Sequence, residues 1–170
     1  MSTSPRKVAI LGGNRIPFAR SNKQYAQASN QDMLTAAIDG LVARYGLQDQ
    51  RLGLVAGGAV LKHARDFNLT RECVMGSALD STTPAIDVQQ ACGTSLAATI
   101  IVADAIAAGR IEAGIAGGTD TASDVPLAVG DELRRTLLRI NRAKSVAERA
   151  KLIGSLRPGQ LAPEQPQNAE

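Results

Sequence analysis

Four short apolar runs alternate along the chain with longer segments whose apolar residues recur at helical spacing. The runs are bounded by glycine, proline or polar residues, as buried strands are, and they occupy residues 7–11, 52–61, 85–89 and 112–118. The intervening segments predict helices over residues 30–45, 69–79 and 93–108. The order β-α-β-α-β-α-β predicts an α/β layer fold with right-handed crossovers.

Local signals mark the ends of two of these helices. We expect Ser29 or Asn30 to cap the first helix and Gly46 to end it, because these residue types satisfy the free backbone groups at helix termini. Asn68 is expected to cap the second helix in the same way.

The helix predicted over residues 93–108 is apolar on nearly every side, with Asp104 as its only charge. A helix of this kind must be covered on most sides, and one sheet covers only one of them. Residues 1–118 offer no second layer. We therefore expect this helix to be buried by something else.

The character of the chain changes after Gly118. Residues 119–126 are turn-rich, residues 131–156 predict one or two basic amphipathic helices, and the rest resembles a linker with three of the seven prolines. The expected organisation is an α/β unit over residues 1–122 and a second unit beginning at residues 123–170. A chain that stops in a loop and leaves an apolar helix uncovered is expected to be part of a larger protein.

Composition narrows the choice of function. Only four of the 170 residues are aromatic, which does not suit a stacking surface for single-stranded nucleic acid. One histidine and no Cys-x-x-Cys motif predict no metal site. Two cysteines indicate a reducing compartment, and the absence of a signal-like or membrane-spanning run favours the cytoplasm of a bacterium.

The net charge of +3 is unevenly distributed. Eight basic residues lie between Arg134 and Arg157, opposed only by Glu148. Such a run is either a solvated helix face or a site for a phosphate-bearing ligand or a nucleic acid backbone.

Cys92 is the candidate nucleophile, because it lies at the junction of a predicted strand and the apolar helix. The free N–H groups and the helix dipole at such a junction favour the reactive thiolate over the thiol. The alternative is a buried cysteine that only packs, which is the interpretation we give to Cys73 in its amphipathic helix. His63 could act as a base for Cys92, but its polar surroundings favour a surface histidine.

Two glycine clusters could be mistaken for nucleotide-binding loops. Gly12-Gly13 is followed by Pro17 and a polar loop rather than by a helix, and the cluster at residues 114–118 has no following Gly-Lys-Ser/Thr. The glycines within residues 114–118 instead predict that the backbone there lies close to the helix that follows Cys92.

Several motifs taken together resemble the thiolases, the acyl-CoA C-acyltransferases of fatty acid β-oxidation. They are Arg15-Ile-Pro-Phe18-Ala-Arg20, Asn68-Leu-Thr-Arg71, Gln90-Ala-Cys92-Gly-Thr-Ser95 and Ala113-Gly-Ile-Ala-Gly-Gly118-Thr-Asp120. Residues 127–133 and 141–152 resemble the thiolase subunit of the trifunctional β-oxidation complexes, so that the similarity spans essentially the whole chain.

The resemblance implies a thiolase-like N-terminal half, in which Cys92 becomes S-acylated and its backbone N–H contributes to an oxyanion hole. The basic segment Arg134 to Arg157 matches the family's loop domain on the side of coenzyme A (CoA), without identifying which residues contact a phosphate. The implied substrates are 3-ketoacyl-CoA, acetyl-CoA and CoA, with no other cofactor. The implied partners are a second or further copies in a homodimer or tetramer, and a hydratase/dehydrogenase subunit.

The chain departs from the family in one respect. Thiolases take an activating histidine and a second cysteine from Gly-His-Pro and Cys-x-Gly motifs in their second half, and neither motif occurs here. We therefore expect the chain to be a fragment that is inactive alone. A ketoacyl synthase of the same superfamily, a non-catalytic CoA- or lipid-binding protein and a basic nucleic-acid-binding module are the alternatives.

Overall fold

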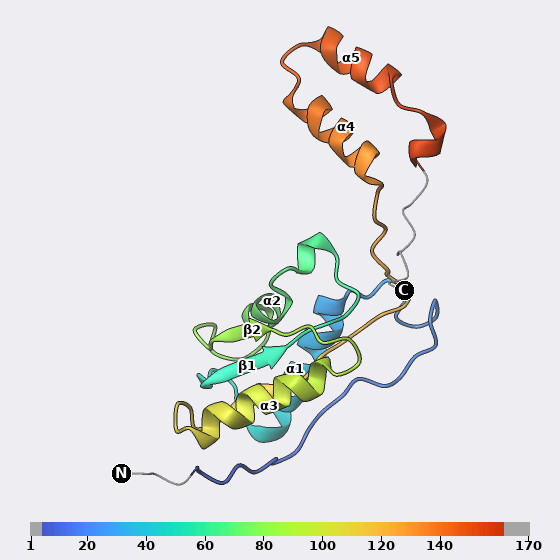
Figure 1. The fold of residues 1–170 in the computed structure, drawn as a ribbon. Helices are drawn as coiled ribbons and strands as arrows, with labels where there is room; N and C mark the ends of the chain where they lie inside the picture. The colour runs from blue at the N-terminus through green and yellow to red at the C-terminus, as the bar shows by residue number, and fades with distance from the viewer. Residues whose placement is uncertain (1–4, 162–170) are drawn as a thin grey trace. The chain divides into compact units, whose positions relative to one another are not determined.

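A computed structural model describes residues 5–161. The chain divides into two compact units, Met1–Val125 and Pro126–Glu170. The first is an α/β unit and the second is helical (Figure 1). Residues 162–170, at the end of the predicted linker, lie outside the described range.

The α/β unit is built on a parallel sheet of three short strands in the order β2-β1-β3. The strands are β1 (Leu54–Gly57), β2 (Ala85–Asp87) and β3 (Gly114–Ala116). Val55 aligns with Ala85 on one side and with Ile115 on the other. Each strand lies inside a predicted run, and each is shorter than its run because pairing ends before the apolar sequence does.

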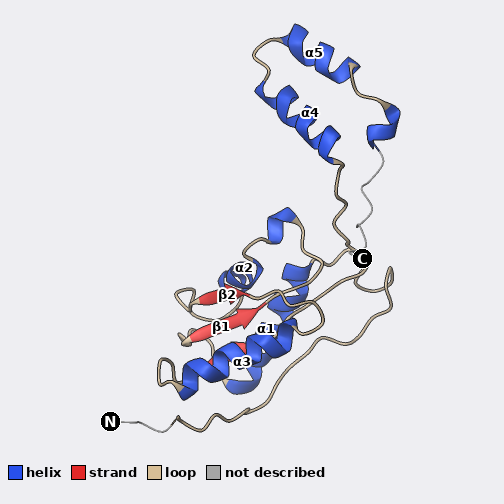
Figure 2. Cartoon of the chain, viewed as in Figure 1, coloured by secondary structure: helices blue, strands red, loops and turns tan. Residues whose placement is uncertain are grey.

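Helices cover both faces of this sheet (Figure 2). On one face, α1 (Asn30–Tyr45) and α2 (Leu69–Gly76) form a core with Val55 that includes Ile38, Val42 and Leu69. On the other face, Ala98 and Val102 of α3 (Thr94–Ala107) pack on Ala56. The predicted α/β layer fold is therefore present, with three strands instead of four.

The N-terminal apolar run is where the strand prediction is wrong. Residues 7–11 form no strand, and Ile10 and Leu11 are 84% and 83% exposed. The run lies outside the sheet, because residues 7–11 form no ladder with the outer edge of β2 or of β3. It is held through its backbone, by hydrogen bonds from the Tyr45 hydroxyl to the Leu11 carbonyl and from Arg44 to the Gly13 carbonyl.

The predicted ends of α1 are confirmed. The Ser29 hydroxyl accepts a hydrogen bond from the backbone N–H of Asp32, and the Asp32 carboxylate accepts one from the Ser29 N–H, which completes a capping box. Gly46 ends the helix at φ +63°, a left-handed conformation that glycine adopts at little cost.

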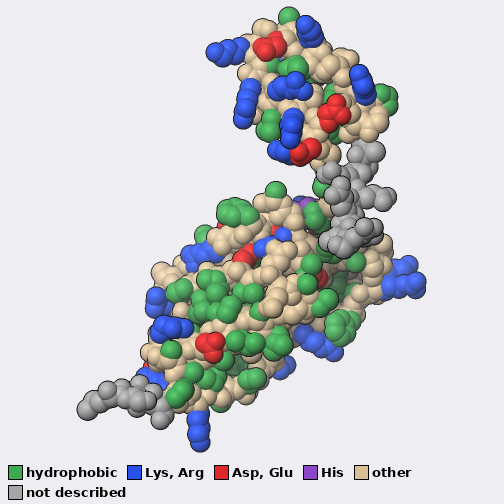
Figure 3. All heavy atoms as spheres, in the orientation of Figure 1, with side chains coloured by type: hydrophobic (Ala, Val, Ile, Leu, Met, Phe, Trp, Pro, Cys, Tyr) green, Lys and Arg blue, Asp and Glu red, His purple; other side chains and the backbone are tan. Residues whose placement is uncertain are grey.

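The outer side of α3 is exposed. Thr94, Ala98, Val102 and Ala105 form its buried row, whereas Leu96 and Ile100 are 66% and 51% exposed. Figure 3 shows hydrophobic side chains gathered on the face of the α/β unit that carries α3 in this view. Within the described part of the α/β unit, residues 5–125, no second layer covers α3.

The helical unit contains α4 (Asp131–Arg142), α5 (Val146–Gly154) and a short 3₁₀ turn, Pro158–Leu161. The prediction of one or two basic helices over residues 131–156 is thus confirmed, and the number of helices is two. Ser145 caps α5 by accepting a hydrogen bond from the Glu148 N–H.

Candidate functional site

Cys92 lies on the surface between β2 and α3. The helix begins two residues later, at Thr94, and no side chain within residues 5–161 caps its N-terminus. An uncapped helix N-terminus offers hydrogen-bond donors and a positive field to an anion. The structure therefore places an accessible thiol where a thiolate, or an oxyanion formed beside it, would be stabilised.

A tight turn carries Cys92. The backbone N–H of Gly93 donates to the Gln90 carbonyl at 2.9 Å, and the N–H of Thr94 donates to the Ala91 carbonyl at 3.2 Å. Ala91 has φ +44°, a left-handed conformation that is uncommon outside glycine. These two hydrogen bonds do not use the Cys92 N–H.

Glycines allow this turn and α3 to approach the sheet closely. A Cβ added to Gly58, just after β1, would lie 1.9 Å from the Val88 carbonyl oxygen and 3.1 Å from Cγ2 of Thr94. One added to Gly118 would lie 2.8 Å from Oγ of Ser95. The predicted role of Gly118 in close approach to the nucleophile helix is confirmed, and Gly58 has the same role.

Asp87, at the end of β2, holds the start of α2. Its carboxylate accepts hydrogen bonds from the backbone N–H groups of Thr70 at 2.7 Å and Leu69 at 3.1 Å, and pairs with Lys62 at 2.9 Å. The expected cap residue, Asn68, makes no side-chain cap. Asp87 takes its place because it reaches the same free N–H groups from the neighbouring strand.

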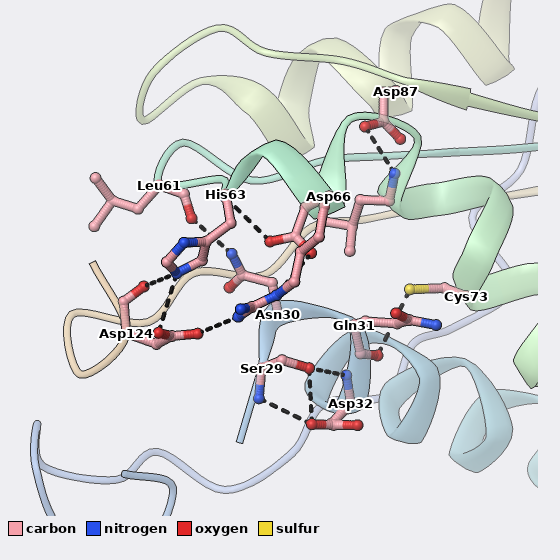
Figure 4. Close-up of polar contacts among 12 residues, drawn as sticks. Ser29, Asn30, Gln31, Asp32, Leu61, His63, Asp66, Cys73, Asp87 and Asp124 are labelled. Carbon is pink, nitrogen blue, oxygen red and sulfur yellow. Dashed lines mark hydrogen bonds and ion pairs between the residues drawn. The ribbon is translucent and has the colours of Figure 1, made fainter. Parts of the chain in front are cut away.

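His63 is paired with Asp124 instead of being a free surface histidine. Its Nε2 lies 3.0 Å from Oδ1 and 3.1 Å from the backbone oxygen of Asp124, and the ring is partly buried. Figure 4 shows this pair of His63 and Asp124. Arg65 binds the other carboxylate oxygen of Asp124. The structure thus uses His63 to fix residue 124 and does not bring it into contact with Cys92.

Cys73 behaves as a packing residue. Its side chain is fully buried in the core of α1, α2 and β1, and its thiol points at the Gln31 carbonyl at 3.6 Å (Figure 4). Burial raises the pKa of Cys73 to about 11, with smaller contributions from the Asp87 and Asp66 carboxylates. The contrast with exposed Cys92 matches the sequence-based interpretation of the two cysteines.

The basic residues between Arg134 and Arg157 belong to the helical unit, where they dominate the charged surface (Figure 3). Arg134 and Arg135 both pair with Asp131, one turn earlier on α4. A hollow of about 350 Å³ adjoins Arg157, but Asp131 and Glu132 also line it. Carboxylates disfavour a phosphate at that hollow, so that it does not identify a CoA contact.

No helix within residues 5–161 is long and apolar enough to cross a membrane. No group of three or more His, Cys, Asp or Glu side chains there could hold a metal ion.

Fold and site together define an α/β protein with an accessible cysteine at the start of a central helix. Residues 8–155 match the family model of the thiolase N-terminal domain. The chain therefore belongs to the thiolase family.

Curated relatives of the chain are named 3-ketoacyl-CoA thiolase. The chain is 37% identical over 164 residues to a 3-ketoacyl-CoA thiolase of Photorhabdus laumondii, which covers 96% of this chain and 38% of that protein. It is 35% identical over 167 residues to a 3-ketoacyl-CoA thiolase of Vibrio cholerae, again 38% of that protein. The chain thus spans well under half the length of these relatives.

A solved structure agrees in fold. The crystal structure of the Bacillus anthracis acetyl-CoA acetyltransferase superposes with a TM-score of 0.72 at 20% identity, covering 77% of this chain and 33% of that one. At this identity the match concerns the fold alone.

Two residues that shape this region, Thr94 and Asp87, could not be identified from the sequence. The Thr94 hydroxyl bonds the turn that carries Cys92, and Asp87 holds the start of α2, so that both roles depend on contacts that only the folded chain makes. The available signal was weak: a hydroxyl residue two positions after Cys92, and an acidic residue at the end of an apolar run.

Proposed function

We propose that this chain supplies the nucleophile of a 3-ketoacyl-CoA thiolase and that Cys92 is that nucleophile. The observation that carries the proposal is an exposed cysteine at the uncapped N-terminus of α3, in a chain of the thiolase family. The names of the relatives support 3-ketoacyl-CoA as the substrate class and fatty acid β-oxidation as the setting.

The proposed reaction proceeds in two steps. The Cys92 thiolate attacks the keto carbon of 3-ketoacyl-CoA, and the bond between that carbon and its α-carbon breaks. Acetyl-CoA leaves as a carbanion that takes up a proton, while the shortened acyl group stays on sulfur. The thiolate of free CoA then attacks the thioester, releasing acyl-CoA and regenerating Cys92. Covalent catalysis divides one difficult step into two easier ones.

The carbonyl oxygen gains negative charge in both attacks, and a preorganised N–H donor stabilises it. We assign one such donor to the backbone N–H of Cys92. Support comes from the turn, whose hydrogen bonds use the N–H groups of Gly93 and Thr94 and leave that of Cys92 out.

Other parts of the proposal rest on family resemblance. The basic segment Arg134 to Arg157 is the candidate region for the CoA phosphates, because its arginines and lysines provide positive charge. The histidine and second cysteine of the reaction would come from sequence that this chain lacks, so that the chain alone is expected to be inactive. A homodimer or tetramer, and association with a hydratase/dehydrogenase subunit, belong to the same proposal.

Replacing the nucleophile tests the assignment. In the protein at its full natural length, Cys92→Ala should lower thiolysis of a 3-ketoacyl-CoA by at least about a thousandfold while the protein stays folded. Cys73→Ala is the matched control and should keep its turnover number, because Cys73 is a core residue. Thiolysis retained by Cys92→Ala would contradict the proposal. Condensation without thiolysis in the wild type would favour a ketoacyl synthase.

A further inference from the structure

The turn that carries Cys92 is held in a conformation that its own residues do not favour. Ala91 sits at φ +44°, where a side chain with a Cβ is strained. Such a conformation persists only when the surrounding structure imposes it. Two backbone hydrogen bonds hold the turn, from the Gly93 N–H to the Gln90 carbonyl and from the Thr94 N–H to the Ala91 carbonyl, and neither one uses the N–H of Gln90.

The Thr94 hydroxyl adds two further hydrogen bonds between the turn and α3. It accepts a hydrogen bond from the backbone N–H of Gln90 at 2.9 Å and donates one to the carbonyl of Ala91 at 2.8 Å. Both groups belong to the turn, one on each side of the strained Ala91 φ angle. A single side chain therefore links the first residue of α3 to the two residues that precede Cys92.

The position of the hydroxyl is itself fixed by packing. Thr94 is 5% exposed, and its methyl carbon Cγ2 faces Gly58, where an added Cβ would lie only 3.1 Å away. The β-branched side chain has few rotamers, so that a methyl group held against Gly58 directs the hydroxyl to the turn. The methyl group and the hydroxyl of Thr94 therefore both have a structural role.

We propose that Thr94 is a positioning residue for Cys92. Its hydroxyl holds the turn over residues 90–93 through these two hydrogen bonds, which we call the clasp, and keeps the thiol at the N-terminus of α3. Without the clasp, Ala91 would relax toward negative φ and carry Cys92 with it. The inference rests on the proposed function, in which the Cys92 thiol is the reacting group, but its test does not depend on acyl transfer.

The test measures the second-order rate of alkylation of Cys92 by iodoacetamide in the full-length protein, followed on the peptide that contains Cys92. Thr94→Val removes both hydrogen bonds of the hydroxyl at nearly constant shape and should slow alkylation roughly tenfold, because the thiol is then held less firmly at the N-terminus of α3. Thr94→Ser keeps the hydroxyl and should stay within about twofold of the wild type.

Thr99→Val is the matched control. Thr99 is on the same helix, and its hydroxyl also bonds a backbone carbonyl, that of Ser95 at 2.8 Å, but it does not touch the turn. Cys92 of this variant should be alkylated at the wild-type rate. Rescue by serine at position 94, with no effect at position 99, separates positioning of the turn from general stabilisation of α3.

A double variant tests the mechanism of the clasp. Glycine adopts positive φ at little cost, so that Ala91→Gly in the Thr94→Val background should recover part of the lost rate. An unchanged alkylation rate in folded Thr94→Val would overturn the proposal. If that variant does not fold, Thr94→Ala carries the same prediction and the same contrary result.

Acetylation of Cys92 by acetyl-CoA is measured on the same proteins. If Cys92 of the wild-type protein is alkylated by iodoacetamide but never acetylated by acetyl-CoA, the assignment of Cys92 as the nucleophile is wrong. The ratio of alkylation rates between Thr94→Val and Thr94→Ser would still decide whether the clasp exists.

Discussion

Asp87 joins three parts of the α/β unit through one carboxylate: β2, the start of α2 and Lys62. Burial of this carboxyl would by itself raise its pKa, but the hydrogen bond from the Thr70 N–H and the Lys62 ammonium outweigh that effect and hold the pKa below its usual range. The charged form is therefore the one that the fold stabilises.

Replacing Asp87 by asparagine should lower the free energy of unfolding at pH 7 by about 2 kcal/mol, because charge-assisted hydrogen bonds are lost. A lowered native pKa gives stability that is present above the unfolded value, near pH 4, and lost as pH falls through the native one. The difference between wild type and Asp87→Asn, measured by urea unfolding, should thus shrink below about pH 4.

Asp104→Asn is the control for this measurement, since Asp104 is exposed on α3 and should be neutral to stability. A difference between wild type and Asp87→Asn that is constant from pH 7 to pH 3 would contradict the role given to the Asp87 charge.

The two cysteines should react at very different rates. Burial raises the pKa of Cys73 to about 11, so that at pH 8 its thiol is both neutral and inaccessible. A thiol reagent at pH 8 should label Cys92 and leave Cys73 unlabelled until urea unfolds the protein, as peptide mass spectrometry would show. Equal labelling of both in the native protein would contradict the assigned burial.

The sequence predicted the structural surroundings of both cysteines, because a strand-to-helix junction and an amphipathic helix are local patterns. It did not predict the partners of Asp87 or Thr94. A carboxylate that caps another segment's helix, or a hydroxyl that ties a turn to the next helix, depends on contacts that only the folded chain creates.

At the scale of elements, helices were predicted more closely than strands. The helix α1 begins and ends where Ser29 and Gly46 indicate, and α3 differs from the predicted span by one residue at each end. Strand limits depend on pairing with a distant segment, so that β1 occupies only Leu54–Gly57 of the predicted residues 52–61. The run at residues 7–11 has the composition of a strand but lies outside the three-stranded sheet.

The junction of β1 with α3 should be intolerant of a larger residue at Gly58. The methyl group of Gly58→Ala would meet the Val88 carbonyl and Thr94, and overpacking of this kind costs about 1–3 kcal/mol. We expect that loss of stability in urea unfolding, together with slower alkylation of Cys92. Gly117→Ala is the control, because an added Cβ there has no atom within 4 Å. Equal stability of the two variants would contradict the close packing.

At the scale of the whole molecule, the described residues contain the proposed nucleophile, Cys92, and the elements that hold it. The turn, the glycines and Asp87 are all within the α/β unit, whereas most of the positive charge of the C-terminal part is on α4 and α5. The apolar outer row of α3, with Leu96 and Ile100, is uncovered within the described residues of the α/β unit, 5–125. The sequence predicted that this helix needs a second covering layer, and that expectation stays a prediction.

The most direct test of the central claim is the mass of the full-length protein before and after incubation with acetyl-CoA. We predict a single acetyl adduct that maps to Cys92, disappears on addition of free CoA and is absent from Cys92→Ala. An adduct on another residue, or none on a folded full-length protein, would contradict the assignment of Cys92 as the acylated nucleophile.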